Sequence, residues 1–240
     1  AIEGSLGRQG DNLLSSLSYK IPRSAGASYV TERRAVTYFP RGSNICTPQA
    51  GTRQVRFNLA SDQFIGLCIL AISLDLNMGA TGIGTPLVDG AHAFFARLRW
   101  NISGTVVEDI EYFNVASEMF HRLTPGEKKE NVENFGFGGI AVPALGVRNL
   151  IMTPKTMCIC SQVLWIPVFA LGAQGCQLEL TLAEGLEIFE SGERQNTQYA
   201  LSNVRALLDV YTISNELHNT FSTHILSGKS LVFPFKTLPN

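Results

Sequence analysis

The chain has 240 residues, enough for one large domain or two small ones with a substantial core. Charged residues make up only 16% of it, against roughly 25% in typical soluble domains, so part of its surface is expected to be buried in an assembly. The formal net charge is -1, and positive residues are dispersed apart from the pairs Arg33-Arg34 and Lys128-Lys129, which argues against wholesale nucleic-acid binding.

Residues 1–28 are small and polar, with Gly4, Gly7 and Gly10 and a serine-rich middle. This composition predicts an extended N-terminal arm rather than a domain. Such an arm is either a disordered tail or a segment that becomes ordered only against neighbouring subunits. Residues 29–240 are expected to form the folded domain.

Three strands are predicted in the first part of this domain. Tyr29–Phe39 is rich in β-forming residues and is followed by turn residues. Arg53–Leu59 alternates apolar and polar side chains, as a half-buried strand does. Phe64–Leu76 is a longer apolar run, which predicts a central strand covered on both faces.

The glycine-rich stretch Asn77–Gly90 is predicted to be a connection. It is not followed by the Gly-Lys-Ser/Thr of a phosphate-binding loop or by a helix start. Ala96, Leu98 and Trp100 then alternate with arginines, and the run Thr105–Val107 is β-branched. With turn residues between them, these two segments predict a β-hairpin.

After Asp109 the spacing of apolar residues changes from two to three and four, which predicts a helix with one apolar stripe. The stripe consists of Tyr112, Val115, Ala116, Met119, Phe120 and Leu123. Thr124-Pro125-Gly126 is expected to end the helix. We expect the stripe to pack against the sheets.

The second half begins with an irregular connection over Glu127–Gly146. Predicted strands follow at Thr156–Gln162, Gln177–Ala183, Asn203–Ile213 and Ser230–Phe235, and a short helix at Asn215–Leu226 is closed by Gly228. Val163–Leu171 is apolar, but Pro167 argues against a central paired position.

These elements predict an all-β fold of eight to ten strands without an internal repeat. Alternating strands with one polar face indicate two packed antiparallel sheets. A jelly-roll β-sandwich with two short helices in its connecting loops fits best, and a general β-sandwich is the fallback.

The cysteines predict neither a disulfide framework nor a metal site. Their number is odd, and no CxxC or paired histidines accompany them. They are expected to be buried free thiols, with two of them on one face of a strand; the five are Cys46, Cys68, Cys158, Cys160 and Cys176. Leu164–Leu171 is apolar but too short to cross a membrane, and no signal peptide is recognisable.

The candidates for chemistry are few. Glu108, Asp109 and Glu111 form an acidic cluster that a metal or acid/base site would use, but a position beside the start of a helix explains it better. The histidines of the predicted helices, which are His121, His218 and His224, form no HxH or HxxxH pair. With no GxSxG elbow either, we expect no catalytic, cofactor-binding or metal-binding residues, no cofactor and no enzyme.

Three classes of function remain open on these grounds: a structural shell protein, a carbohydrate- or protein-binding β-sandwich module, and an enzyme on a β scaffold. A binding module is expected to expose aromatic residues, whereas Trp100 and Trp165 lie in apolar runs. The low charge, the predicted arm and the jelly-roll pattern favour the shell protein.

Several stretches resemble the major capsid proteins of viruses built from jelly rolls. The closest likeness is to the double jelly-roll lineage of polinton-like and adintovirus-like elements. The stretches that carry this resemblance are Ala91–Arg99, Val107–Asn114, Phe120–Lys128, Leu164–Phe169, Gln177–Leu180 and Gly228–Phe235.

The resemblance implies a capsid protein that self-assembles into an icosahedral virion and encloses the genome. Its partners would be copies of itself, as a trimer, and other capsid proteins, with nucleic acid touched at most weakly from the inner surface. It would be made in the host cell and located in the virion. We expect subunit contacts from Asn77–Gly90, from Glu127–Gly146 and from the arm.

The family carries two jelly rolls in one chain, whereas this sequence has room for one. Either it is the first half of a double jelly roll, or it is a single jelly-roll shell protein. An expected strand close before the last residues, Pro239-Asn240, is compatible with a second half.

Overall fold

The computed structural model describes residues 30–48, 53–88, 90–123, 141–154, 159–163, 165–172, 175–192 and 195–228, with Val232 and Lys236. The predicted arm over residues 1–28 lies outside the described residues, as do Cys158 and most of the predicted Glu127–Gly146 connection. The predicted last strand, Ser230–Phe235, lies outside them except for Val232.

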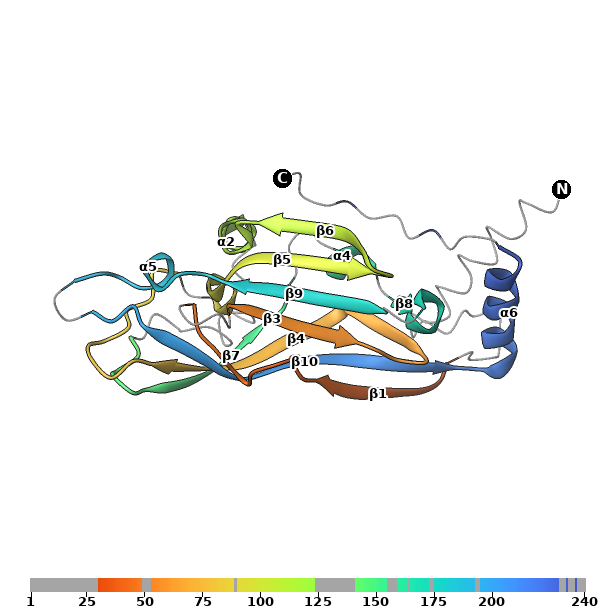
Figure 1. The fold of residues 1–240 in the computed structure, drawn as a ribbon, viewed down its shortest axis with the longest axis horizontal. Coiled ribbons are helices and arrows are strands. Elements are labelled where there is room, and N and C mark those ends of the chain that lie inside the picture. Colours follow the sequence, from red (N-terminus) through yellow and green to blue (C-terminus); the bar gives the residue numbers. More distant parts are fainter. Residues whose placement is uncertain are drawn as a thin grey trace.

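Two antiparallel sheets form the two layers of the molecule (Figure 1). The six-stranded sheet has the order β1-β10-β4-β7, with short β2 beside β10 and β8 beside β4. Its strands are β1 (Val30–Tyr38), β10 (Tyr199–Ile213), β4 (Phe64–Met78), β7 (Val147–Met152), β2 (Ile45–Cys46) and β8 (Trp165–Pro167). The four-stranded sheet has the order β3-β9-β5-β6, with β3 (Gln54–Leu59), β9 (Cys176–Leu182), β5 (Phe95–Ile102) and β6 (Thr105–Glu111).

The strand order is that of a jelly roll. When the eight strands longer than three residues are numbered along the chain, one sheet runs first, eighth, third, sixth, and the other runs second, seventh, fourth, fifth. The first and last of these strands are therefore neighbours, with Val36 of β1 opposite Leu208 of β10. Such interlocked Greek keys define a jelly roll, so the predicted fold class is confirmed.

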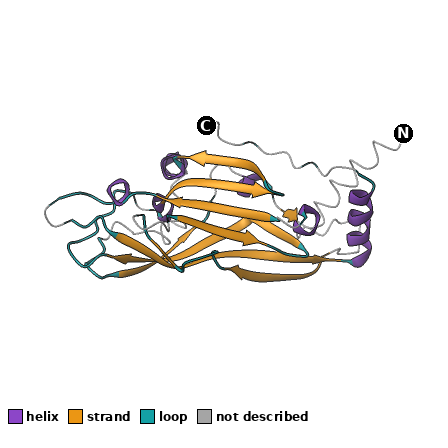
Figure 2. Ribbon diagram, in the orientation of Figure 1, coloured by secondary structure: helices purple, strands orange, loops and turns teal. Residues whose placement is uncertain are grey.

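Both predicted helices are present, α2 over Phe113–Leu123 and α6 over Asn215–Leu226. Gly228 ends α6 as predicted: its φ of 76° lies in the left-handed region, which glycine adopts without strain, and its N–H donates to the carbonyl of Ile225 at 2.9 Å. One-turn helices that the sequence did not predict lie in the connections: η1 (Ala91–Phe94), α4 (Ile159–Gln162), η2 (Val168–Leu171) and α5 (Gly185–Ile188). The helices flank the sheets rather than separating them (Figure 2).

Alternation along the strands builds the core between the two sheets. Leu178, Leu180 and Leu182 of β9 are fully buried, whereas the residues between them are only half-buried. The same alternation places Val55, Phe57 and Leu59 of β3 inside. Burying these side chains stabilises the fold by roughly 1.5–3 kcal/mol for each large residue.

Two strand predictions need correction, and one strand was missed. The described end of the predicted strand Thr156–Gln162 is helical, since Ile159–Gln162 forms α4; the buried carboxylate of Glu108 accepts the N–H of Ile159 at 2.9 Å and stabilises that turn. β7 was not predicted, because only Leu150 and Met152 in it are buried and its pairing with β4 defines it. β4 is central as predicted, but Cys68 and Ile69 interrupt its burial.

The long connections are joined to one another at one end of the sandwich. Isolated bridges link Gly84 to Val142 and Pro86 to Phe189. Phe94, Phe189 and Tyr199 pack as an aromatic cluster with ring centroids 5.2 to 6.1 Å apart. The Tyr199 hydroxyl donates to the carbonyl of Ala183 at 2.6 Å, and burial raises the pKa of that hydroxyl. We use the term braced end for this part of the sandwich, because backbone bridges and packed aromatic rings connect its loops to one another.

A ladder of ion pairs crosses the outer face of the four-stranded sheet. It runs through residues that the register places directly opposite one another: Arg56 of β3, Glu179 of β9, Arg99 of β5 and Asp109 of β6. Successive nitrogen–oxygen distances in the ladder are 3.0, 3.8 and 2.9 Å. Arg97 joins Asp109 at 2.6 Å, and also Glu111 at 3.3 Å. Opposite charges in direct cross-strand positions stabilise a sheet.

Asp109 is the most strongly held carboxylate of this ladder. Arg97 donates to it through two nitrogens, both at 2.6 Å, and Arg99 donates at 3.1 and 2.9 Å. The hydrogen bonds from Arg97, with those from Arg99, outweigh partial burial and hold the pKa of Asp109 below its usual range. Asp109 therefore stabilises the folded state as an anion.

Replacing Gly185 by alanine should destabilise the braced end. A Cβ there would lie 1.7 Å from the backbone carbonyl oxygen of Thr197, which cannot move without shifting the chain before β10. We expect Gly185→Ala to lower the free energy of unfolding in urea by about 2 kcal/mol or more. In Gly192→Ala, where the nearest atom is 3.5 Å away, the change should stay within about 0.5 kcal/mol. Equal effects would contradict the close approach at Gly185.

Removing the charge of Asp109 should make the free energy of unfolding depend less on pH in the acidic range. Because the folded-state pKa is lowered, the contribution of Asp109 is present above its unfolded pKa and is lost as the pH falls through the folded value. Asp109→Asn should cost about 1–2 kcal/mol at pH 7, and the difference from the unmodified chain should shrink below about pH 4. Thermal unfolding across pH measures this. Glu32→Gln, on the exposed part of β1, is the control, and it should leave the free energy of unfolding at pH 7 nearly unchanged.

Candidate functional site

The most distinctive surface of the described residues is the outer face of α2. After β6, Tyr112 adopts a positive φ of 54°, and the chain turns sharply into the helix. Phe113 and Ser117 point into the molecule and are buried. On the opposite side Tyr112, Met119 and Leu123 are 73%, 61% and 78% exposed, and Val115 lies exposed between them.

The prediction that the apolar stripe of α2 packs against the sheets is therefore wrong for these four residues. Ala116 and Phe120, the other two members of the predicted stripe, are half-buried. The helix carries apolar side chains on two of its faces, because Phe113 begins a second series one residue after Tyr112. Spacing alone does not tell which of two such faces meets the sheets.

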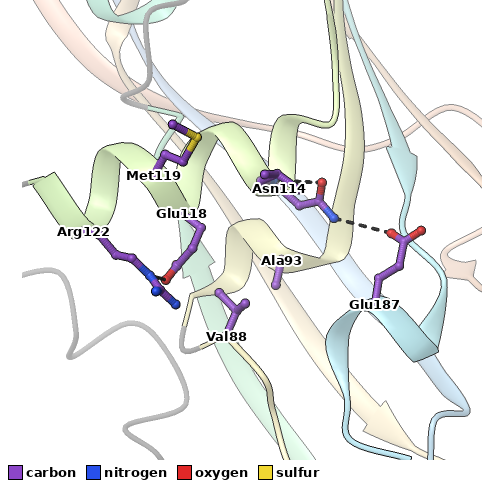
Figure 3. Close-up of a pocket in the computed structure, with 8 residues that line it drawn as sticks. Val88, Ala93, Asn114, Glu118, Met119, Arg122 and Glu187 are labelled. Carbon is purple, nitrogen blue, oxygen red and sulfur yellow. Dashed lines mark hydrogen bonds and ion pairs between the residues drawn. The ribbon is translucent and has the colours of Figure 1, made fainter.

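A hollow of about 250 Å³ adjoins the exposed stripe, between α2, η1 and α5. Its apolar lining is Val88, Ala93, Val115 and Met119, and its polar lining is Asn114, Glu118, Arg122 and Glu187. Figure 3 shows Arg122 and Glu118 at one side of the hollow, with Asn114 reaching towards Glu187 at the other.

Two exposed leucines, Leu87 and Leu186, directly precede Val88 and Glu187, which line the hollow. Leu186 lies on α5 beside Glu187, and the N–H of Leu87 donates to the carbonyl of Ile188 at 2.8 Å, which places Leu87 next to α5. We use the term α2 face for Tyr112, Val115, Met119, Leu123, Leu87 and Leu186. Exposed apolar patches of this kind mark interaction surfaces.

An ion-pair network attaches α2 to η1 beneath the hollow. The carboxylate of Glu118 lies 2.7 Å from Nε of Arg122 and 3.2 Å from Nε2 of His92. Burial raises the pKa of Glu118, but the hydrogen bonds from Arg122 and His92 outweigh it, so the pKa is lowered and Glu118 stays ionised. The His121 ring lies 6.0 Å from that of His92.

Sequence reasoning missed this network. His92 and Glu118 are 26 positions apart, and they meet because η1 packs under α2. The glycine before η1 is a local signal of the arrangement: a Cβ on Gly90 would lie 2.1 Å from the His92 ring. Only a residue without a side chain allows that ring to lie over the turn.

The acidic cluster does not lie at the start of α2, so the predicted helix-dipole explanation is wrong. The first turn of α2 contains no acidic residue, and all three carboxylates belong to β6. Asp109 and Glu111 point outward into the ion-pair ladder. Glu108, the residue before Asp109, points inward, is buried, and caps α4. Strand alternation thus separates the cluster into two structural roles.

The remaining candidates are also dispersed. His218 packs on the Phe169 ring at 4.5 Å, and His224 is in the last turn of α6. Cys46, Cys160 and Cys176 are buried thiols as predicted, with burial raising the pKa of Cys176 to about 12, but Cys68 is exposed.

Within the part of the chain that the structure describes, no three His, Cys, Asp or Glu side chains come together as a metal site would require. Nor is any helix there long and apolar enough to cross a membrane.

No protein-family model matches the chain, and no curated protein matches it. Solved structures of viral proteins do. PBCV-1 VP54, fitted into a reconstruction of the virophage Sputnik, superposes with a TM-score of 0.57 at 11% identity, over 83% of this chain and 47% of that one. A chain of the PBCV-1 virus capsid gives 0.57 at 12% identity, with the same shares of the two chains. The Faustovirus major capsid protein gives 0.51 at 7% identity, over 85% of this chain and 58% of that one.

These likenesses concern the fold alone, because sequence identities of 7 to 12% are too low to show more than a similar fold. They show that the jelly-roll fold of this chain is similar to the folds of these solved viral capsid chains, as the resemblance led us to expect. The chain spans about half the length of the solved capsid proteins that it matches.

Proposed function

We propose that this chain is a structural shell protein, whose jelly roll forms part of the wall of an icosahedral viral capsid enclosing the genome. The observation that carries the proposal is the jelly-roll strand order, together with a superposition on chains of solved viral capsids that covers 83% of this chain. A shell needs a rigid slab with contacts at its edges. The two packed sheets and the braced end would supply such a slab, and the α2 face is suited to making a contact at its edge.

The proposal includes a domain organisation. Residues 29–240 would form one jelly-roll domain behind an N-terminal arm over residues 1–28. This domain would be either the first half of a double jelly roll or a single jelly-roll shell protein, and the chain spans about half the length of the capsid chains that it matches. Copies of the protein would associate as trimers, and these would join one another and other capsid proteins through many individually weak contacts.

The other expectations follow from this role. A shell protein needs no catalytic group or cofactor. It would be made in the host cell and become part of the virion, and a net charge of -1 leaves at most weak contact with nucleic acid from the inner surface.

The alternative, a carbohydrate- or protein-binding module, is less well supported. A binding module is expected to expose its tryptophans, and both of them, Trp100 and Trp165, are buried; the exposed aromatic rings among the described residues are those of Phe39 and Tyr112. Trp165 packs instead against Tyr211, with ring centroids 6.3 Å apart.

Self-association of the purified chain tests the proposal. We expect sedimentation velocity to show oligomers that grow with concentration, and negative-stain microscopy to show them as discrete capsomers or closed shells. Leu98→Asp, which places a charge in the core of β5, is the control: it should abolish ordered particles, whereas unspecific aggregation would persist or increase. A chain that stays monomeric at every concentration tested would contradict the shell function.

A further inference from the structure

We propose that the α2 face is a contact between two copies of this chain, which pack about a two-fold axis with their α2 helices antiparallel. The inference rests on the proposed function, because it names one contact of the assembly. It commits to a second copy as the occupant of this face, and it is argued from the spacing of the apolar side chains and from the charges around them.

The apolar side chains have the spacing of a helix–helix seam. Tyr112, Val115 and Met119 follow one another at three and four residues, and Leu123 continues the series. A seam with this period lets two helices pack side by side along their length. With the helices antiparallel, Tyr112 of each copy lies near Leu123 of the other, and Val115 lies near Met119. The hollow beside Val115 and Met119 gives room for side chains of the second copy.

The charges around the seam favour this pairing. Arg122, whose side chain is 72% exposed, lies near the C-terminal end of α2. Glu187 lies near the N-terminal end, where Asn114 reaches it at 3.5 Å. In an antiparallel pair, Arg122 of one copy therefore approaches Glu187 of the second copy, and the same contact repeats across the axis.

The match points to a second copy rather than to an unrelated partner. A positive group at one end of a seam and a negative group at the other are complementary to the same surface turned by 180°. The two helix dipoles also oppose each other in this arrangement. Arg122 uses its Nε for Glu118, and a guanidinium carries further N–H donors for a second carboxylate.

The contact is expected to be weak on its own. The α2 face and its charged rim contain fewer residues than the 20–30 on each side of a standard stable interface. A weak pairwise contact suits an assembly in which each subunit makes several contacts at once.

Charge reversal in two separate chains tests the antiparallel pairing. Arg122→Glu gives a seam with acidic groups at both ends, and Glu187→Arg gives one with basic groups at both ends. Each variant alone should associate about tenfold more weakly than the unmodified chain in sedimentation velocity, because like charges then meet. An equimolar mixture of the two should recover association, since both contacts across the axis then join opposite charges.

Two further variants distinguish the loss of the seam contact from the loss of folding. Met119→Glu places a charge in the centre of the seam and should abolish the contact. Leu226→Glu changes an apolar side chain that is 87% exposed on α6, away from the seam, and should leave association unchanged. Thermal unfolding of every variant measures folding independently.

The outcomes distinguish this contact from the shell function. If the mixture associates no better than the single variants, or if Met119→Glu associates like the unmodified chain, the α2 contact is overturned while assembly through other faces stands. If Met119→Glu lowers stability and leaves association unchanged, the face is covered within its own chain, which also overturns the contact. An unmodified chain that never associates would overturn both proposals.

Discussion

The pairing of the two longest strands is the constraint on which the rest of the structure depends. β4 and β10 have 15 residues each and lie side by side in the middle of the larger sheet. Together they connect β1 on one side with β7 on the other, and their inner side chains form the floor of the core. The smaller sheet packs over the apolar surface that these side chains form. The connections that cross between the two sheets then give the strands their jelly-roll order.

This arrangement divides the polar residues between two environments. On β6 the inward Glu108 stabilises a helical turn inside the molecule, and the outward Asp109 joins an ion-pair ladder across all four strands of the sheet. The ladder leaves its charges mutually neutralised on a flat face. The braced end, beside which α2 lies, is different, because apolar side chains remain exposed there. Exposed apolar surface therefore lies beside a part of the fold whose connections are bridged to one another, which suits the proposed subunit contact.

Sequence periodicity was sufficient wherever one face of an element is buried and the other is not. It located β3, β5, β9 and β10, the hairpin of β5 and β6, and both longer helices, since burial on one side leaves a direct record in the order of residues. It failed for β7, α4 and the orientation of α2. For β7 and α4, a partner far along the chain decides the local structure: β7 pairs with β4, and the carboxylate of Glu108 caps α4.

The sequence by itself determined the class of fold, the inward residues of most strands, and the absence of any local catalytic or metal-binding motif. The tertiary structure alone decided what the polar groups do and which surface stays open. It brought His92 to Glu118 across 26 positions, set the acidic residues of β6 on opposite sides of a sheet, and turned the apolar stripe of α2 outward. The physical reason is that periodicity records which side chains share a face, whereas only packing decides what that face meets.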